Sequence, residues 1–133
     1  MSKLIVRNFA VAALAVLCGC HPKTPPVATP ADVASAQEEA RKEVEQARVE
    51  ARKDVKSAAK VSGGDAKNVA HARATGAFDI AMAQAEGDHK IALTRCKTLE
   101  PGAQPPCTAE ADAQFQAAIA KAKAARVGGE SQP

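Results

Sequence analysis

EARKEVEQARVEARKDV, which runs from Glu39 to Val55, contains nearly the same six-residue sequence twice. The run that starts at Glu39 returns at Glu50, eleven residues later, with only one acid exchanged for the other. Eleven residues fill three helical turns at about 3.67 residues per turn, close to the 3.6 of a straight α-helix. The period therefore predicts a long helix whose apolar face stays aligned along its length.

That face consists of valine and alanine at repeated spacings of three, four and four residues. Its members are Val33, Ala36, Ala40, Val44, Ala47, Ala51, Val55 and Ala58. Thr29 is suited to cap this helix and Pro30 to occupy its first position. Charged residues cover the other faces, where pairs three or four residues apart contribute only a few tenths of a kcal/mol. We therefore predict a charged, solvated helix over residues 32–61.

The same period continues in a second predicted helix, from about Ala66 to Thr98, after a break at Ser62-Gly63-Gly64-Asp65. Three eleven-residue segments starting at Asn68 align without gaps, and Gly76 coincides with Gly87. A glycine within a helix costs about 1 kcal/mol relative to alanine. Two interpretations are open: either a neighbouring helix approaches closely at these glycines, or the helix is weak there and even interrupted at Gly87.

A third helix is expected from about Thr108 to Val127, after a loop rich in proline and glycine over residues 100–107. Its apolar face contains Phe115 and Ile119, and Gly128 is expected to end it. The two later helices, residues 66–127, predict an antiparallel hairpin, followed by a flexible tail over residues 128–133. The fold class is all-α, with elongated, alanine-rich helices in eleven-residue repeats.

The N-terminus has the pattern of an export signal. Lys3 and Arg7 precede the apolar run from Phe9 to Leu17, which is too short for the roughly 20 residues that span a bilayer. The following Leu-Cys-Gly-Cys, residues 17–20, resembles the lipobox of bacterial lipoproteins. In that family the signal, here residues 1–19, is removed and the cysteine, here Cys20, is acylated.

Membrane attachment is what this resemblance implies. One fatty chain binds a bilayer reversibly, whereas three, palmitate among them, hold the protein permanently. By similarity to enterobacterial lipoproteins, His21 after the cysteine favours the outer membrane over the inner one. Four prolines between His21 and Pro30 predict an extended tether over residues 20–31, with the chain beyond it in the periplasm.

Two cysteines remain once the signal and the acylated Cys20 are set aside. Cys96 is expected to end the second helix and Cys107 to precede the third, where a hairpin brings its legs together. The periplasm is oxidising, so a structural disulfide is the favoured interpretation. Free thiols are the alternative, and redox or metal chemistry is a weaker one because no Cys-x-x-Cys spacing is present.

The sequence offers no recognisable active site. His71 and His89 are eighteen residues apart, without a second ligand four residues away, and we interpret them as surface or half-buried residues. No catalytic, cofactor-binding or metal-ligating residue is expected. The formal charge is +3, and removal of Lys3 and Arg7 with the signal leaves +1, so nucleic acid is not an expected partner. From Cys20 onward only fifteen residues in 114 are Leu, Ile, Val or Phe, which favours a slender shape.

The stretch from about Ala77 to Arg126, with its paired cysteines, resembles small uncharacterised Ala/Lys-rich envelope proteins of proteobacteria, loosely called TolA-like. The murein lipoprotein is a weaker analogy, because its C-terminal lysine joins peptidoglycan whereas this chain ends in Pro133. The resemblance implies a non-enzymatic lipoprotein that contacts an envelope protein, peptidoglycan or its own copies. The alternative is a stress-protective or membrane-surface amphipathic protein, similar to late-embryogenesis-abundant proteins.

Overall fold

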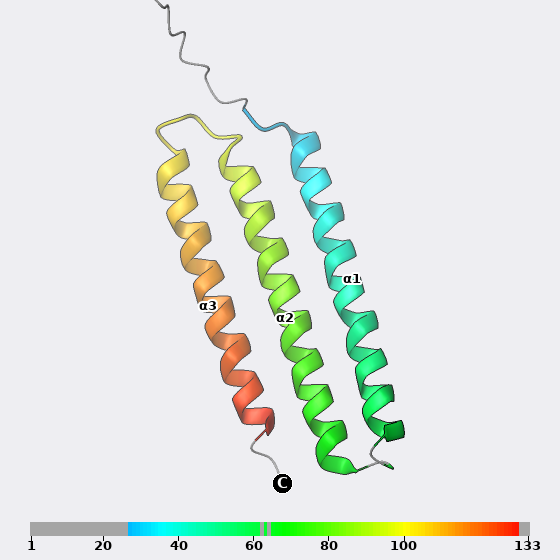
Figure 1. Ribbon diagram of the computed structural model, residues 1–133. Coiled ribbons are helices and arrows are strands. Elements are labelled where there is room, and N and C mark those ends of the chain that lie inside the picture. The colour runs from blue at the N-terminus through cyan, green and yellow to red at the C-terminus, as the bar shows by residue number, and fades with distance from the viewer. Residues whose placement is uncertain (1–26, 62, 64, 131–133) are drawn as a thin grey trace, which may run out of the picture.

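The computed structural model describes residues 27–61, 63 and 65–130, and this part of the chain is all-α, as predicted. It contains the helices α1 (Pro30–Val61), α2 (Ala66–Cys96) and α3 (Gln104–Glu130), shown in Figure 1. At 1.5 Å per residue, α1 and α2 are each about 47 Å long and α3 about 40 Å. The expected signal peptide, Cys20 and most of the expected tether lie outside the described residues.

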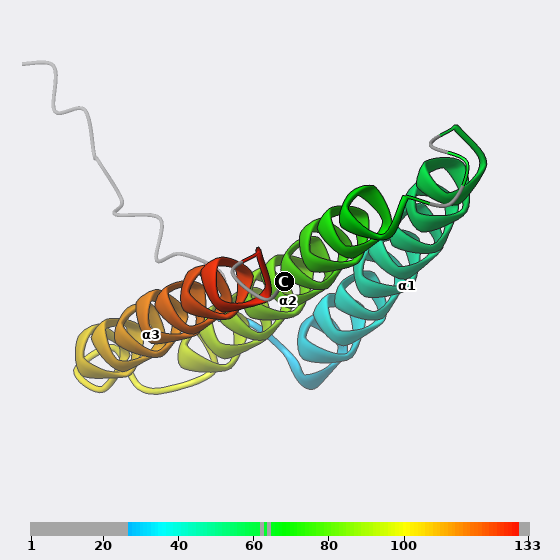
Figure 2. The same cartoon turned by 90° about the horizontal axis from the view of Figure 1, so that it is seen from below.

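The three helices lie side by side in a single flat layer, seen end-on in Figure 2. α2 is the middle helix and packs against α1 along one edge and α3 along the other, each antiparallel to it. The described residues of α1 and α3 do not contact each other. Most domains pack two layers of secondary structure around one core. The described helices form only one layer, so no second layer covers either of its broad faces.

The first turn of α1 is fixed by Thr29, as the sequence predicts. The Thr29 hydroxyl accepts from the backbone N–H of Asp32 at 3.3 Å, and the Thr29 N–H donates to the Asp32 carboxylate at 2.7 Å. This reciprocal arrangement satisfies two donors that a helix start leaves unpaired. The backbone N–H and hydroxyl of Thr29 also hold the pKa of Asp32 below its ordinary value.

Close contact with α1 explains the two glycines of α2. A Cβ atom added at Gly76 would lie 2.6 Å from the Cβ of Ala51, and one added at Gly87 would lie 2.7 Å from the Cβ of Ala40. The helices touch at backbone level at both points, which are eleven residues apart on each helix. Of the two open interpretations, close approach is therefore correct: α2 continues unbroken through Gly87.

The opposite edge of α2 follows the same period. The buried apolar residues there are Ala85 and Cys96 on α2, eleven residues apart, and Ala111 and Ala122 on α3, also eleven apart. On α1 the buried residues are Ala36 and Ala40. The eleven-residue period thus places small residues along every helix contact, and these contacts replace a conventional core of large side chains.

The helix ends differ from the sequence prediction in three places. α2 ends at Cys96 rather than Thr98, and α3 begins at Gln104, four residues before Thr108. Pro105 and Pro106 lie in the first turn of α3, where a missing N–H costs nothing, so they do not exclude helix. α3 also continues past Gly128, because glycine permits a helix end without requiring one.

The predicted break between α1 and α2 is confirmed. Gly63 has a φ of 60°, a left-handed conformation that glycine adopts without strain. Asp65 caps α2, its carboxylate accepting from the backbone N–H of Lys67 at 2.9 Å. The sequence therefore located this turn correctly, although the turn after α2 is shorter than expected.

Candidate functional site: the disulfide end of the layer

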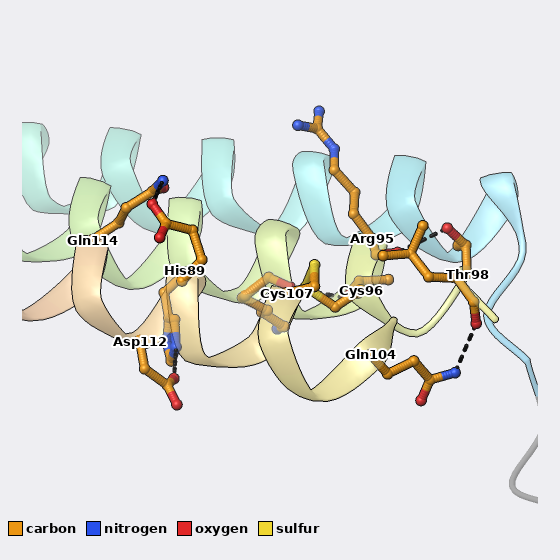
Figure 3. The surroundings of a disulfide bond; sticks show 12 residues. His89, Arg95, Cys96, Thr98, Gln104, Cys107, Asp112 and Gln114 are labelled. Carbon is orange, nitrogen blue, oxygen red and sulfur yellow. Dashed lines mark hydrogen bonds and ion pairs between the residues drawn. A yellow bond between two sulfur atoms is a disulfide. The ribbon is translucent and has the colours of Figure 1, made fainter. Parts of the chain in front are cut away.

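A disulfide joins Cys96, the last residue of α2, to Cys107 in the first turn of α3 (Figure 3). The Cα atoms are 5.6 Å apart, within the ordinary range for a disulfide. The Cys96 side chain is only 2% exposed, so packing as well as the covalent bond fixes its position. Of the open interpretations of the two cysteines, the structural disulfide is the one that the structure contains.

The short connection between α2 and α3 is held by hydrogen bonds beside the disulfide. The Thr98 hydroxyl donates to the carbonyl oxygen of Arg95 at 2.7 Å, and the Gln104 amide donates to that of Leu99 at 2.9 Å. These carbonyl oxygens lie near the end of α2, where helical partners run out. The loop is therefore tied at both of its ends as well as by the cysteines.

The segment that enters α1 meets the same end of the layer. The backbone N–H of Ala28 donates to the carbonyl oxygen of Lys97 at 3.3 Å, directly after Cys96. The first described residues and the disulfide loop are therefore neighbours.

His89 lies against α3 two turns before the disulfide. Its imidazole stacks on the ring of Phe115, with the centroids 4.5 Å apart and the planes within 4° of parallel. Its Nε2 is 2.7 Å from the Asp112 carboxylate, which accepts a hydrogen bond from the tautomer protonated at that nitrogen (Figure 3). The histidine side chain is 20% exposed and Asp112 is 58% exposed. His89 therefore makes both a ring contact and a hydrogen bond across α2 and α3.

Of the interpretations of His89 as a surface or half-buried residue, half-buried is correct, but the sequence did not reveal its two partners on α3. A usable signal was present. The disulfide sets the antiparallel register, so a residue seven before Cys96 must face residues five to eight after Cys107. Asp112 and Phe115 fall in that window. No other hydrogen bond joins the His89 ring to a described residue.

The described residues, 27–61 and 65–130, contain no group of three or more His, Cys, Asp or Glu side chains placed to hold a metal ion. His71 lies on the exposed surface of α2, eighteen residues before His89, and the two do not form a common site. Among the described helices, none is both long enough and apolar enough to cross a bilayer.

One ion pair connects α1 and α2 in the half of the layer nearer the disulfide. The Lys90 ammonium donates to the Glu39 carboxylate, and both groups are about half exposed. The hydrogen bond and charge of Lys90 lower the pKa of Glu39, and the hydrogen bond and charge of Glu39 raise the pKa of Lys90. Exposed pairs of this kind contribute little to stability.

The chain was compared with protein-family models, with curated proteins and with solved structures, and none of them matches it. The disulfide end is therefore characterised by its own geometry. Cys96 and Cys107 are brought together as predicted, whereas Cys20 lies outside the described residues.

Proposed function

We propose that this protein is a non-enzymatic, lipid-anchored lipoprotein of the outer membrane, acylated at Cys20. Its helical layer stands on the periplasmic side and has a structural or interaction role in the cell envelope. Its partners are the membrane, through the anchor, and an envelope protein, peptidoglycan or a second copy of the chain.

The disulfide is the observation that carries this proposal. Disulfides persist in oxidising compartments and are rare in the reducing cytosol. The Cys96–Cys107 geometry needs no rearrangement of α2 or α3, since the Cα atoms already stand 5.6 Å apart. A stable cross-link at this position supports export, which the N-terminal signal pattern independently predicts.

The place where the chain enters the layer also supports an anchor. Ala28 is hydrogen-bonded to Lys97 at the disulfide end, and eight residues of extended chain reach about 25 Å. An acyl group on Cys20 would therefore hold this end near the lipid surface. The broad faces of the flat layer would remain available for contact with other molecules.

Metabolic labelling with radioactive palmitate tests the anchor. The wild-type protein is expected to incorporate label and to fractionate with the outer membrane, whereas the Cys20→Ala variant should do neither. Cys18→Ala is the matched control and should leave labelling unchanged. Absence of label from the wild-type protein would contradict the proposal, as would recovery of Cys96 and Cys107 as free thiols from unstressed cells.

Circular dichroism separates this proposal from the stress-protective alternative. A packed layer predicts high helicity in dilute buffer and a cooperative melt. A protein that becomes ordered only at lipid surfaces or on drying would show low helicity in buffer. In-cell cross-linking followed by mass spectrometry would then identify the partner.

A further inference from the structure

The arginines of the layer gather along the grooves on one of its faces. Two grooves follow the contact between α1 and α2 and are lined by Arg41 and Arg48, and by Arg48, Arg52 and Arg73, respectively. A third groove between α2 and α3 is lined by Arg73 and Arg126. Because neighbouring grooves share Arg48, Arg73 and Ala77, they belong to one continuous surface, which we name the arginine face.

The charge of this face is strongly unbalanced. A further groove beside Arg52 and Arg73 adds Lys53 and Lys56. The acidic residues that line the four grooves are only Glu45 and Asp88. The face is therefore cationic even though basic and acidic residues nearly cancel in the chain after the signal.

The local ion pairs compensate only part of this charge. Arg41 pairs with Glu38 at 3.4 Å. Arg48 and Arg52 both pair with the single carboxylate of Glu45, at 3.7 and 3.2 Å. Arg73, where three of the grooves meet, has no ion pair with any residue of the described part of the chain. Guanidinium groups prefer planar, bidentate contacts with phosphate or carboxylate oxygens. The arginine face thus has unused capacity to bind anionic groups.

The shape of the face indicates what kind of anion it fits. Arg41 and Arg52 are about 16 Å apart along α1, and Arg126 extends the charge across the width of the layer to α3. A cationic surface spread over three helices suits an extended anionic surface. The apolar residues between the arginines of the first two grooves, Val44, Val55 and Ile80, are half-buried and aliphatic. The third groove contains one aromatic side chain, Phe78, which is half-buried and lies under the Arg126 guanidinium. The face therefore has no exposed bulky aromatic side chain of the kind that inserts into lipid.

We propose that the arginine face docks on an anionic phospholipid bilayer, binding lipid phosphates without insertion, so that the anchored layer lies flat on the membrane. The proposal deepens the proposed function, because it names the surface that the layer contacts, and it rests on that function. Each basic residue near an anionic bilayer contributes to such binding, and salt screens the contribution.

Arginine footprinting tests the docking on the full-length protein as cells produce it. The protein is reconstituted into vesicles of phosphatidylcholine, or of phosphatidylcholine mixed with phosphatidylglycerol, and treated with phenylglyoxal, and modified arginines are located by mass spectrometry. On the mixed vesicles Arg48, Arg52 and Arg73 should react about fivefold more slowly than on phosphatidylcholine. High salt should abolish this protection.

Charge variants give the matched controls. Arg52→Gln with Arg73→Gln should remove the protection of Arg48 and Arg126, whereas Lys60→Gln with Lys123→Gln, which removes the same charge from residues outside the grooves, should preserve it. Arg52→Lys with Arg73→Lys keeps the charge and should preserve most of the protection. Circular dichroism establishes that each variant is folded.

Two results would overturn the docking. One is equal arginine reactivity on both kinds of vesicle. The other is protection by soluble polyphosphate on phosphatidylcholine vesicles without protection by phosphatidylglycerol, which would assign the face to a soluble polyanion. Retention of the protein on washed phosphatidylcholine vesicles reports the anchor separately, so failure of the anchor and failure of the docking are distinguishable.

Discussion

The two edges of α2 are held in different ways. Along the α1 edge, Gly76 and Gly87 let the backbones approach until they touch Ala51 and Ala40. Along the α3 edge, the contact depends on added groups: the Cys96–Cys107 disulfide and the stack of His89 on a phenyl ring. The α1 interface therefore depends on close backbone packing at the two glycines. The α3 interface has in addition a disulfide and a ring stack.

Because the two interfaces depend on different contacts, each can be weakened separately. α1 and α3 do not touch in the described part of the chain, so a change on one edge of α2 should leave the other edge largely intact. Sites that share no partners usually contribute additively to stability. The following predictions test that separation.

Removal of the disulfide should have the largest effect. Cys96→Ala with Cys107→Ala releases a loop closed across a sequence separation of 11 residues, which costs about 3 kcal/mol in the chain-entropy model. Urea unfolding followed by circular dichroism measures the loss. Hydrogen exchange should quicken in α3 and much less in α1; equal quickening in both helices would contradict separate interfaces.

Filling a glycine contact should have the next largest effect. Gly87→Ala forces α1 and α2 apart at a cost of about 3 kcal/mol, and the better helix propensity of alanine recovers about 1 kcal/mol. We expect a net loss of about 2 kcal/mol in the free energy of unfolding. Backbone hydrogen exchange should then quicken in α1 and much less in α3.

Gly128→Ala is the matched control for this substitution, because a Cβ atom there meets nothing within 4 Å. It should stabilise the protein by about 1 kcal/mol or less. If Gly87→Ala and Gly128→Ala both destabilise the protein, the contact between α1 and α2 is not the cause of the loss at Gly87.

The ring stack should contribute less. A double-mutant cycle of His89→Ala and Phe115→Ala is expected to give a coupling of about 1 kcal/mol, typical of stacked rings. The Phe78 ring lies under the Arg126 guanidinium instead. A double-mutant cycle of His89→Ala and Phe78→Ala should therefore give a coupling near zero. Comparable couplings in both cycles would mean that the His89 contact with Phe115 is not specific.

The smallest effect is the pH dependence of the Glu39–Lys90 pair. The lowered pKa of Glu39 gives stability that is present above its ordinary value of 4.5 and is lost as the pH falls through the folded value. The raised pKa of Lys90 gives stability that is present below 10.5 and is lost as the pH rises through the folded value. The difference in stability between wild-type protein and Lys90→Gln should therefore be greatest between these limits and shrink outside them. Urea unfolding at several pH values measures it, and a difference that does not change with pH would contradict the pairing.

Sequence periodicity predicted most of the fold. The three-four-four spacing identified the apolar face of α1, and the glycine run after Val61 located the first turn. The sequence prediction starts α3 too late because it assigns Pro105 and Pro106 to a loop, although a helix tolerates proline in its first turn. Local composition could not show that tolerance, since it depends on where the helix begins.

Contacts between helices were harder to predict. The glycines suggested close approach, but their spacing does not say which helix approaches, and the flat arrangement depends on which edge of α2 each helix occupies. The cysteine pairing was predictable, whereas Asp112 and Phe115 became partners of His89 only once the disulfide set the register. The arginine face was not apparent either, because its members are distributed over all three helices.

An odd number of antiparallel helices separates the two ends of the described chain. Val27 lies beside the disulfide loop, whereas Glu130 lies a full helix length away, about 40 Å along α3. A fluorophore attached after α3 would therefore act as a pointer for the orientation of the molecule. Its energy transfer to a dye in the bilayer would be strong if the helices lie parallel to the membrane and weak if they stand perpendicular to it.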